Sequence, residues 1–178
     1  ELINQIHQLK QSYYKKIVEQ GKIKLRTGVR RLINELKQKH IKQIIVTTSS
    51  REALVSLLKS QIPDYKLIFS ELITSEDVIK LKPYPDCYLK ALTLSGLHPR
   101  DILAIEDSPN GVESALRAGL SCLMTLSHWD DFRSINESDQ KLAITEHLGD
   151  EDKNTTIIKG PPIDDKYIGL NYLNKIIK

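Results

Sequence analysis

Two patterns of hydrophobic residues run along the chain. Apolar residues spaced three or four apart predict amphipathic helices, the first of them over residues 2–20. Short uninterrupted apolar runs predict buried strands, and the two clearest are residues 43–48 and 102–105. Strands and helices that follow one another in this way predict an α/β fold built on a parallel sheet.

The same criteria predict the remaining elements. Apolar stripes predict further helices at residues 29–36, 51–58, 85–92, 112–116 and 167–177. Apolar runs predict further strands at residues 66–69, 122–125, 141–145 and 155–159. Residues 71–81 follow neither pattern, so we expect an irregular and partly helical passage there.

A row of hydroxyl side chains ends the strand predicted at residues 43–48. The hydroxyls belong to Thr47, Thr48, Ser49 and Ser50, and Arg51 then opens the next helix. Small hydroxyls at a junction of strand and helix can donate hydrogen bonds to a phosphate. Capping of the helix by Ser49 or Ser50 needs no ligand and, taken alone, is the simpler explanation.

A stiff loop precedes the helix predicted at residues 85–92. Pro83 keeps Lys82 out of the α conformation, and Pro85 suits the first turn of a helix. Lys82 is therefore expected just ahead of a helix N-terminus, which is a favourable place to hold an anion. The alternative is a lysine on a surface loop.

Two carboxylates, Glu106 and Asp107, directly follow the strand predicted at residues 102–105. In an open α/β sheet, ligands bind at the carboxyl ends of the strands. Adjacent acids repel each other, and a hard cation between them and an anionic substrate relieves that repulsion. The alternative is a solvated loop in which Asp107 caps the next helix.

Composition narrows the classes of protein and partner. The chain of 178 residues has a net charge of +3, and its basic residues are scattered, so we expect no nucleic-acid partner. Cys87 and Cys122 belong to no Cys or Cys/His cluster, which favours buried thiols in a reducing compartment. No run reaches the length of a membrane span and no signal peptide is visible. We therefore expect a cytoplasmic globular protein with no membrane partner.

Three successive segments thus end in polar groups, namely the hydroxyls of Thr47 and Thr48, the ammonium group of Lys82, and the carboxylates of Glu106 and Asp107. The carboxyl ends of parallel strands meet at one edge of a sheet, so these groups can converge. Together with a divalent cation they match the needs of a phosphoryl group, whose transfer depends on positioning and charge neutralisation. Each signal alone is weak, but the ordered set is specific.

This order of motifs resembles that of the haloacid dehalogenase superfamily of phosphotransferases. Thr47 matches its second motif, Lys82 in KPYPD its third, and Glu106 with Asp107 in IEDSPNG its fourth. The resemblance covers residues 7 to about 126 and is greatest to the CbbY-type sugar-phosphate phosphatases and the β-phosphoglucomutases. It implies a three-layer, Rossmann-like α/β core with a parallel sheet.

The resemblance also implies a role for each matched residue. Thr47 would bind the transferring phosphoryl group, and Lys82 would balance its charge. Asp107 would bind Mg²⁺ directly, and Glu106 directly or through water. His7 and Lys10 would contact the distal phosphate of the substrate. The loop that also reaches the substrate would consist of Thr48, Ser49, Ser50 and Arg51. For His7 the alternative is exposure to solvent on a helix.

The first motif of the superfamily, DxDGT or DxDGV, is absent from these residues. In the family it supplies the aspartyl nucleophile, the general acid/base and the remaining Mg²⁺ ligands. Asp150-Glu151-Asp152 has the acid spacing but lacks the glycine and a preceding apolar strand. Most of the family's helical cap is also missing. We therefore expect residues 1–25 to be the end of a cap domain with its hinge, and residues 26–178 to be a core without its first strand.

Three classes of function remain. We expect foremost a Mg²⁺-dependent phosphatase of small phosphorylated sugars that works through a phospho-aspartate, with xylulose 1,5-bisphosphate as a candidate substrate. His7 and Lys10 favour it over a β-phosphoglucomutase-like phosphotransferase, because a second phosphate needs its own cationic site. The other classes are a non-catalytic phosphate-binding relative and a structural α/β module. We expect a monomer. We also expect this chain to be the C-terminal portion of a longer enzyme, and the portion by itself to bind metal poorly and to turn over no substrate.

Overall fold

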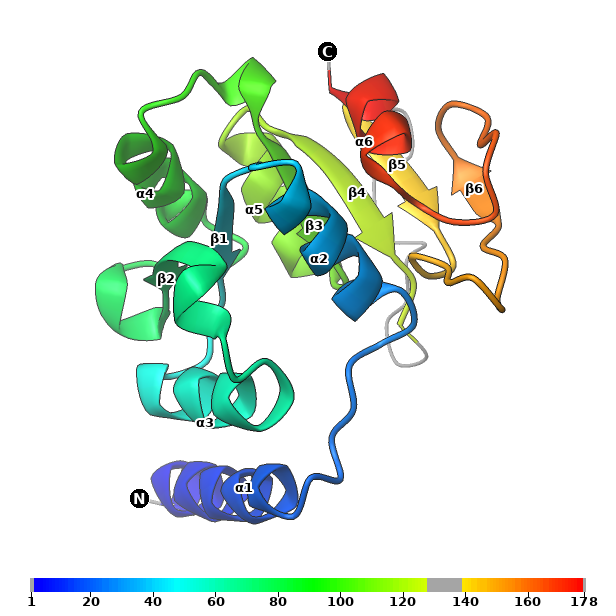
Figure 1. Ribbon diagram of the computed structural model, residues 1–178. Helices are drawn as coiled ribbons and strands as arrows, with labels where there is room; N and C mark the ends of the chain where they lie inside the picture. Colours follow the sequence, from blue (N-terminus) through cyan, green and yellow to red (C-terminus); the bar gives the residue numbers. More distant parts are fainter. Residues whose placement is uncertain (1, 128–138, 178) are drawn as a thin grey trace.

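The computed structural model describes residues 2–127 and 139–177, in which helices and strands alternate from α2 to β4 (Figure 1). The helices are α1 (Leu2–Glu19), α2 (Val29–Gln38), α3 (Arg51–Gln61), α4 (Asp86–Ser95), α5 (Pro109–Arg117) and α6 (Leu170–Ile176). The strands are β1 (Gln43–Val46), β2 (Phe69–Ile73), β3 (Leu103–Glu106), β4 (Ser121–Thr125), β5 (Leu142–Thr145) and β6 (Ile157–Lys159). The α/β class expected from the sequence is confirmed.

The described strands form two sheets. β1 pairs with β2 in parallel, and the second sheet has the order β3-β4-β5-β6. Its first three strands are parallel, while β6 runs antiparallel to β5 at the edge. All five residues of β4 are buried, as is typical of a parallel strand with helices on both faces.

Helices cover both faces of the four-stranded sheet, which gives three layers. α4 and α5 pack on one face in a cluster that includes Ala115, Met124 and Ile144. α2 and α6 pack on the other face, where Leu36 and Leu173 belong to the cluster around Leu123 of β4. α3 packs against the two-stranded sheet in a third cluster. The carboxyl ends of β1 and β3 therefore lie between helical layers.

One strand begins later than the sequence predicts. Residues 65–67 form a 3₁₀ turn, and β2 starts at Phe69 and continues to Ile73. The strand expected at residues 66–69 and the irregular passage expected from residue 71 are thus wrong in their bounds. Along β2 only Ile73 is fully buried, while Ser70 and Glu71 are both exposed. No alternation marks this strand, which instead depends on pairing with β1.

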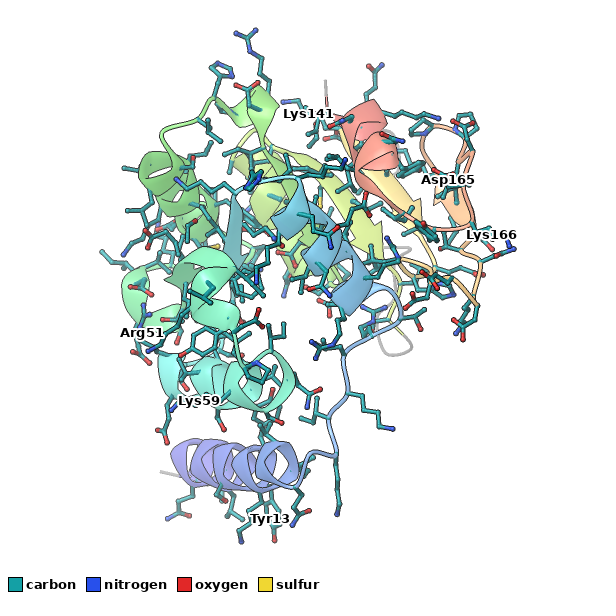
Figure 2. All side chains as sticks on the ribbon, in the orientation of Figure 1. Tyr13, Arg51, Lys59, Lys141, Asp165 and Lys166 are labelled. Atoms are coloured by element: carbon teal, nitrogen blue, oxygen red, sulfur yellow. The ribbon has the colours of Figure 1, made fainter. Side chains whose placement is uncertain are left out.

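Helix α1 lies apart from the three layers and contacts α3 (Figure 1). Val18 is buried, whereas Leu9 and Tyr13 are exposed, and Figure 2 shows Tyr13 on the side of α1 away from α3. Residues 22–26 form no helix or strand and lead to α2. The division of the chain at residue 25 into cap and core stays a prediction. In the described part of the chain, no helix combines the length and hydropathy needed to cross a membrane.

Candidate active site

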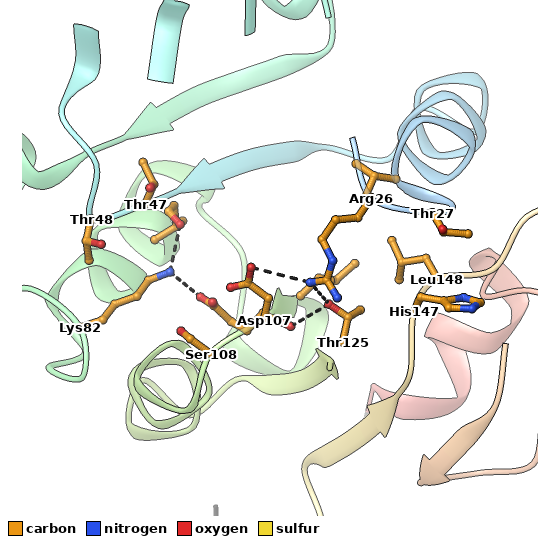
Figure 3. A pocket seen from close by; sticks show the side chains of 14 residues that line it. Arg26, Thr27, Thr47, Thr48, Lys82, Asp107, Ser108, Thr125, His147 and Leu148 are labelled. Carbon is orange, nitrogen blue, oxygen red and sulfur yellow. Dashed lines mark hydrogen bonds and ion pairs between the residues drawn. The ribbon is translucent and has the colours of Figure 1, made fainter. Parts of the chain in front are cut away.

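Three residues that are far apart in the sequence line one pocket of about 360 Å³ (Figure 3). Thr47 directly follows β1, Asp107 directly follows β3, and Lys82 comes from the loop before α4. The pocket lies at the carboxyl ends of parallel strands, where open α/β sheets bind their ligands. It therefore unites side chains from all three sequence motifs.

Lys82 and Glu106 form a buried ion pair in the wall of this pocket. The ammonium nitrogen Nζ of Lys82 lies 2.5 Å from Glu106 Oε1 and 3.0 Å from the carbonyl oxygen of Val46. The two side chains are only 10% and 7% exposed. Because an unpaired buried charge costs several kcal/mol, each of the two groups needs the other. The alternative of a solvated surface lysine is therefore wrong for Lys82.

Tyr88 of α4 completes this cluster. Its hydroxyl donates a hydrogen bond to Glu106 Oε1, and its ring centre lies 5.3 Å from Lys82 Nζ. Burial, and then the neighbouring carboxylate, raise the pKa of Tyr88 well above its usual value, so the phenol stays protonated as a donor. The sequence analysis placed Tyr88 only in the apolar stripe of its helix, because its spacing is that of an ordinary core residue.

The carboxylates of Glu106 and Asp107 occupy different surroundings. Glu106 faces α5, and a Cβ at Gly111 would lie 2.0 Å from Glu106 Oε2, so glycine is needed there. The Asp107 side chain remains 62% exposed at the pocket. Ser108 caps α5 by accepting a hydrogen bond at 3.2 Å from the backbone N–H of Gly111. The alternative in which Asp107 caps this helix is therefore wrong.

Two ionisable lining residues were missed by the sequence analysis, Arg26 and His147. The Arg26 guanidinium donates to Thr125 Oγ1 at 3.0 Å and lies 3.7 Å from Asp107. Burial, aided by nearby basic side chains, lowers the pKa of His147, which favours its neutral ring. The sequence assigns Arg26 only to the expected hinge before the core, and His147 lies beyond the stretch that resembles the family, so neither was predicted to face the pocket.

The loop of hydroxyls divides between the pocket and a helix. Thr47 and Thr48 line the pocket, and Thr47 Oγ1 accepts a hydrogen bond from the backbone N–H of Ser49 at 3.1 Å. Ser50 caps α3 through a hydrogen bond of 3.3 Å from the backbone N–H of Ala53. The capping alternative is thus confirmed for Ser50.

Arg51 points away from the pocket. Its guanidinium lies 2.6 Å from Asp77 Oδ2 and donates to the carbonyl oxygen of Leu72 at 3.1 Å. Figure 2 shows Arg51 on the outer side of the molecule. The proposed distal-phosphate residues His7 and Lys10 belong to α1, but their side chains lie outside the described residues. Contacts of these three residues with a substrate stay predictions.

Asp107 is the described carboxylate that best fits a divalent cation. It opens to the pocket, whereas Glu106 already accepts hydrogen bonds from Lys82 and Tyr88. Among residues 2–127 and 139–177, no three His, Cys, Asp or Glu side chains gather in a way that could hold a metal ion. Mg²⁺ is commonly held by one or two carboxylates together with water and phosphate oxygens. The described residues therefore fit part of a Mg²⁺ site and do not complete one.

The family of haloacid dehalogenase-like hydrolases matches residues 1–125. The chain belongs to this family. The CbbY protein of Cupriavidus necator is 33% identical to this chain over 151 residues, which cover 84% of this chain and 58% of that protein. The CbbY protein of Rhodobacter capsulatus is 36% identical over 136 residues, which cover 73% of this chain and 59% of that protein. The chain thus spans less than two thirds of these relatives, and the CbbY-like resemblance is confirmed.

Solved structures give the same family relationship. A CbbY mutant from Rhodobacter sphaeroides in complex with xylulose 1,5-bisphosphate superimposes on this structure with a TM-score of 0.68 and 30% identity, over 75% of this chain and 61% of that chain. A hydrolase of the same superfamily from Entamoeba histolytica gives a TM-score of 0.62 and 27% identity, over 68% of this chain and 55% of that chain. These likenesses support the Rossmann-like core inferred from the motifs.

Proposed function

We propose that this chain forms part of a Mg²⁺-dependent phosphatase of small sugar phosphates that works through an aspartyl phosphate. The single pocket shared by Thr47, Lys82 and Asp107 carries the proposal. Thr47 would donate a hydrogen bond to a phosphoryl oxygen, and Lys82 would balance the charge of the phosphoryl group. Asp107 would hold Mg²⁺, which neutralises phosphate charge when bound. The nucleophilic aspartate would come from outside these 178 residues.

We infer a sugar bisphosphate of the xylulose 1,5-bisphosphate type as the substrate. The CbbY relative in complex with that compound supports this choice. His7 and Lys10, three residues apart on α1, would together hold the distal phosphate. Cys87 and Cys122 are free and buried, which suits the expected reducing, cytoplasmic location. That location and the monomeric state stay predictions.

The test measures release of inorganic phosphate by the native protein that contains this sequence, with Mg²⁺ and with EDTA. We expect hydrolysis of xylulose 1,5-bisphosphate to be faster than that of β-glucose 1-phosphate and to require Mg²⁺. Asp107→Ala and Lys82→Ala should each lower kcat/KM roughly 100-fold, since each removes a key electrostatic group. Lys59→Ala, on the exposed side of α3 (Figure 2), is the control and should leave kcat/KM unchanged.

The alternative functions give different results in the same assay. Faster turnover of β-glucose 1-phosphate would favour the phosphoglucomutase-like class. Binding of phosphate without turnover would favour a non-catalytic relative. Activity that survives both Asp107→Ala and Lys82→Ala would refute the proposal and leave a structural α/β module.

A further inference from the structure

Tyr88 lies behind the wall of the candidate active site. It is only 6% exposed and does not line the pocket, whereas Lys82 and Glu106 do. Helix α4 begins at Asp86, so Tyr88 lies in its first turn, shortly after the loop that carries Lys82. Tyr88 can therefore act on a ligand in the pocket only through Lys82 or Glu106.

The hydroxyl of Tyr88 helps to fix the carboxylate of Glu106. A buried phenol hydroxyl usually has a hydrogen-bond partner, and here the acceptor is Glu106 Oε1. The same oxygen accepts a hydrogen bond from Lys82 Nζ at 2.5 Å. The other oxygen, Oε2, packs against Gly111, where a Cβ would lie only 2.0 Å from it. Two donors and one close contact therefore set the rotation of this carboxylate.

The fixed carboxylate in turn orients the ammonium group of Lys82. Nζ donates to Glu106 Oε1 and, at 3.0 Å, to the carbonyl oxygen of Val46. An ammonium group has three N–H donors, so two bonds leave one donor in one remaining direction. Among residues 2–127 and 139–177, no acceptor lies within hydrogen-bond distance of that third donor. Because Lys82 lines the pocket, this N–H is available to an anion there.

We propose that Tyr88 is a positioning residue for phosphoryl transfer, whose hydroxyl holds Glu106 so that Lys82 keeps one N–H directed at the phosphoryl group. The role in turnover rests on the proposed function, whereas the hold on Lys82 does not. Catalysis is sensitive to such support, since a displacement of about 1 Å in a catalytic group can cost roughly 100-fold in rate. The apolar stripe of α4 requires only the ring of Tyr88, so the hydroxyl is the part that serves the site.

The first test removes the hydroxyl and keeps the ring. Tyr88→Phe retains an aromatic ring whose centre lies 5.3 Å from Lys82 Nζ and removes the donor to Glu106. In this chain, labelled with ¹⁵N at its lysines, NMR follows exchange of the Lys82 ammonium hydrogens with water. We expect Tyr88→Phe to speed this exchange by about threefold or more, because the carboxylate that holds the ammonium group can then rotate.

The second test follows turnover of xylulose 1,5-bisphosphate with Mg²⁺ by the native protein that contains this sequence. Tyr88→Phe should lower kcat by about tenfold and leave KM nearly unchanged, because a misdirected N–H costs most in the transition state.

Tyr172→Phe is the matched control for both tests. Tyr172 is 3% exposed, lies on α6 at the opposite face of the sheet, and donates to the carbonyl oxygen of Pro161 at 3.1 Å. Its variant also loses a buried hydroxyl, but should leave Lys82 exchange and kcat unchanged.

Three outcomes overturn the inference. The first is Lys82 exchange that is no faster in Tyr88→Phe than in Tyr172→Phe. The second is Lys82 exchange in the unsubstituted chain that is as fast as exchange at the exposed Lys59. The third is faster exchange in Tyr88→Phe with an unchanged kcat, which would show that the hold on Lys82 does not serve the reaction. Faster exchange in a native protein that has no phosphatase activity would instead refute the proposed function and leave the hold on Lys82 standing.

Discussion

Glu106 accepts hydrogen bonds from Lys82 and Tyr88 through one carboxylate oxygen, while its other oxygen packs against Gly111. These three neighbours come from a loop and from two different helices, α4 and α5. At the scale of single residues, this cluster therefore couples three elements to the end of β3. The motifs in the sequence identify Lys82 and Glu106, but as partners of a substrate and a metal and not of each other.

Removing one member of the buried ion pair should destabilise the fold more than removing both. Lys82→Met leaves the Glu106 carboxylate buried without its cation, so we expect the free energy of unfolding to fall by about 3 kcal/mol or more. The double variant Lys82→Met/Glu106→Met should lose less than this, because no buried charge remains. Urea unfolding of the four proteins of this cycle measures both effects.

An exposed pair provides the matched control for this cycle. Lys37 and Asp64 lie 2.8 Å apart, and their side chains are 41% and 48% exposed. Lys37→Met should therefore leave the free energy of unfolding nearly unchanged, because water screens an exposed pair. Strictly additive losses from Lys82→Met and Glu106→Met would show that the two groups do not stabilise each other.

At the scale of elements, a short 3₁₀ turn at Ser75–Asp77 ties the end of β2 to the start of α3. The backbone N–H and the hydroxyl of Thr74 both donate to Asp77 Oδ2 at 2.8 Å, and the Arg51 guanidinium lies 2.6 Å from the same oxygen. The hydrogen bonds from Thr74, followed by the charges of Arg51 and Lys90, lower the pKa of Asp77 to about 2. Arg51 therefore has a structural partner that does not line the pocket.

This lowered pKa predicts an acid-dependent loss of stability. A carboxylate whose pKa is lower in the folded state stabilises the fold above its unfolded pKa of about 4, and this contribution is lost as the pH falls toward 2. Asp77→Asn should therefore cost about 1–2 kcal/mol at pH 7 and progressively less between pH 4 and pH 2. Urea unfolding across this range measures the difference. The exposed Asp152→Asn is the control, and a difference that is constant with pH would contradict the prediction.

At the scale of the whole molecule, the two sheets and the pocket between their ends depend on one another. Lys82 bonds to Val46 of β1 and to Glu106 of β3, so its ammonium group links the two sheets. Arg26 connects the segment after α1 to the carboxyl end of β4 through Thr125. A ligand held at this junction contacts residues from both sheets and should therefore stabilise the folded molecule as a unit.

Inorganic phosphate should raise the free energy of unfolding of this chain. At ten times its dissociation constant, a ligand that binds only the folded state stabilises it by about 1.4 kcal/mol. Thermal unfolding with and without phosphate, at constant ionic strength, measures the shift. The stabilisation by phosphate should vanish in Thr47→Val, which keeps the shape of the side chain but loses its hydroxyl. The same stabilisation should persist in Lys59→Ala. An equal increment in both variants would place phosphate outside the pocket.

Much of the fold follows from local patterns in the sequence. Apolar spacing predicts the six helices of the described chain and five of its six strands within a few residues. The candidate residues Thr47, Lys82 and Asp107 were identifiable because each lies beside a strand end or a helix start that its own neighbours specify. Strand β2 was misplaced because its burial pattern is irregular and its position depends on pairing with β1.

The sequence by itself therefore determined the class of the fold, the order of its elements and the motif residues of the pocket, since these depend on chemistry within a few neighbouring positions. Only the tertiary structure decided that Glu106 pairs with Lys82 and Tyr88 and that Arg26 and His147 line the pocket. Such contacts join residues that are distant along the chain. They arise from the packing of all the layers together, which no local spacing encodes.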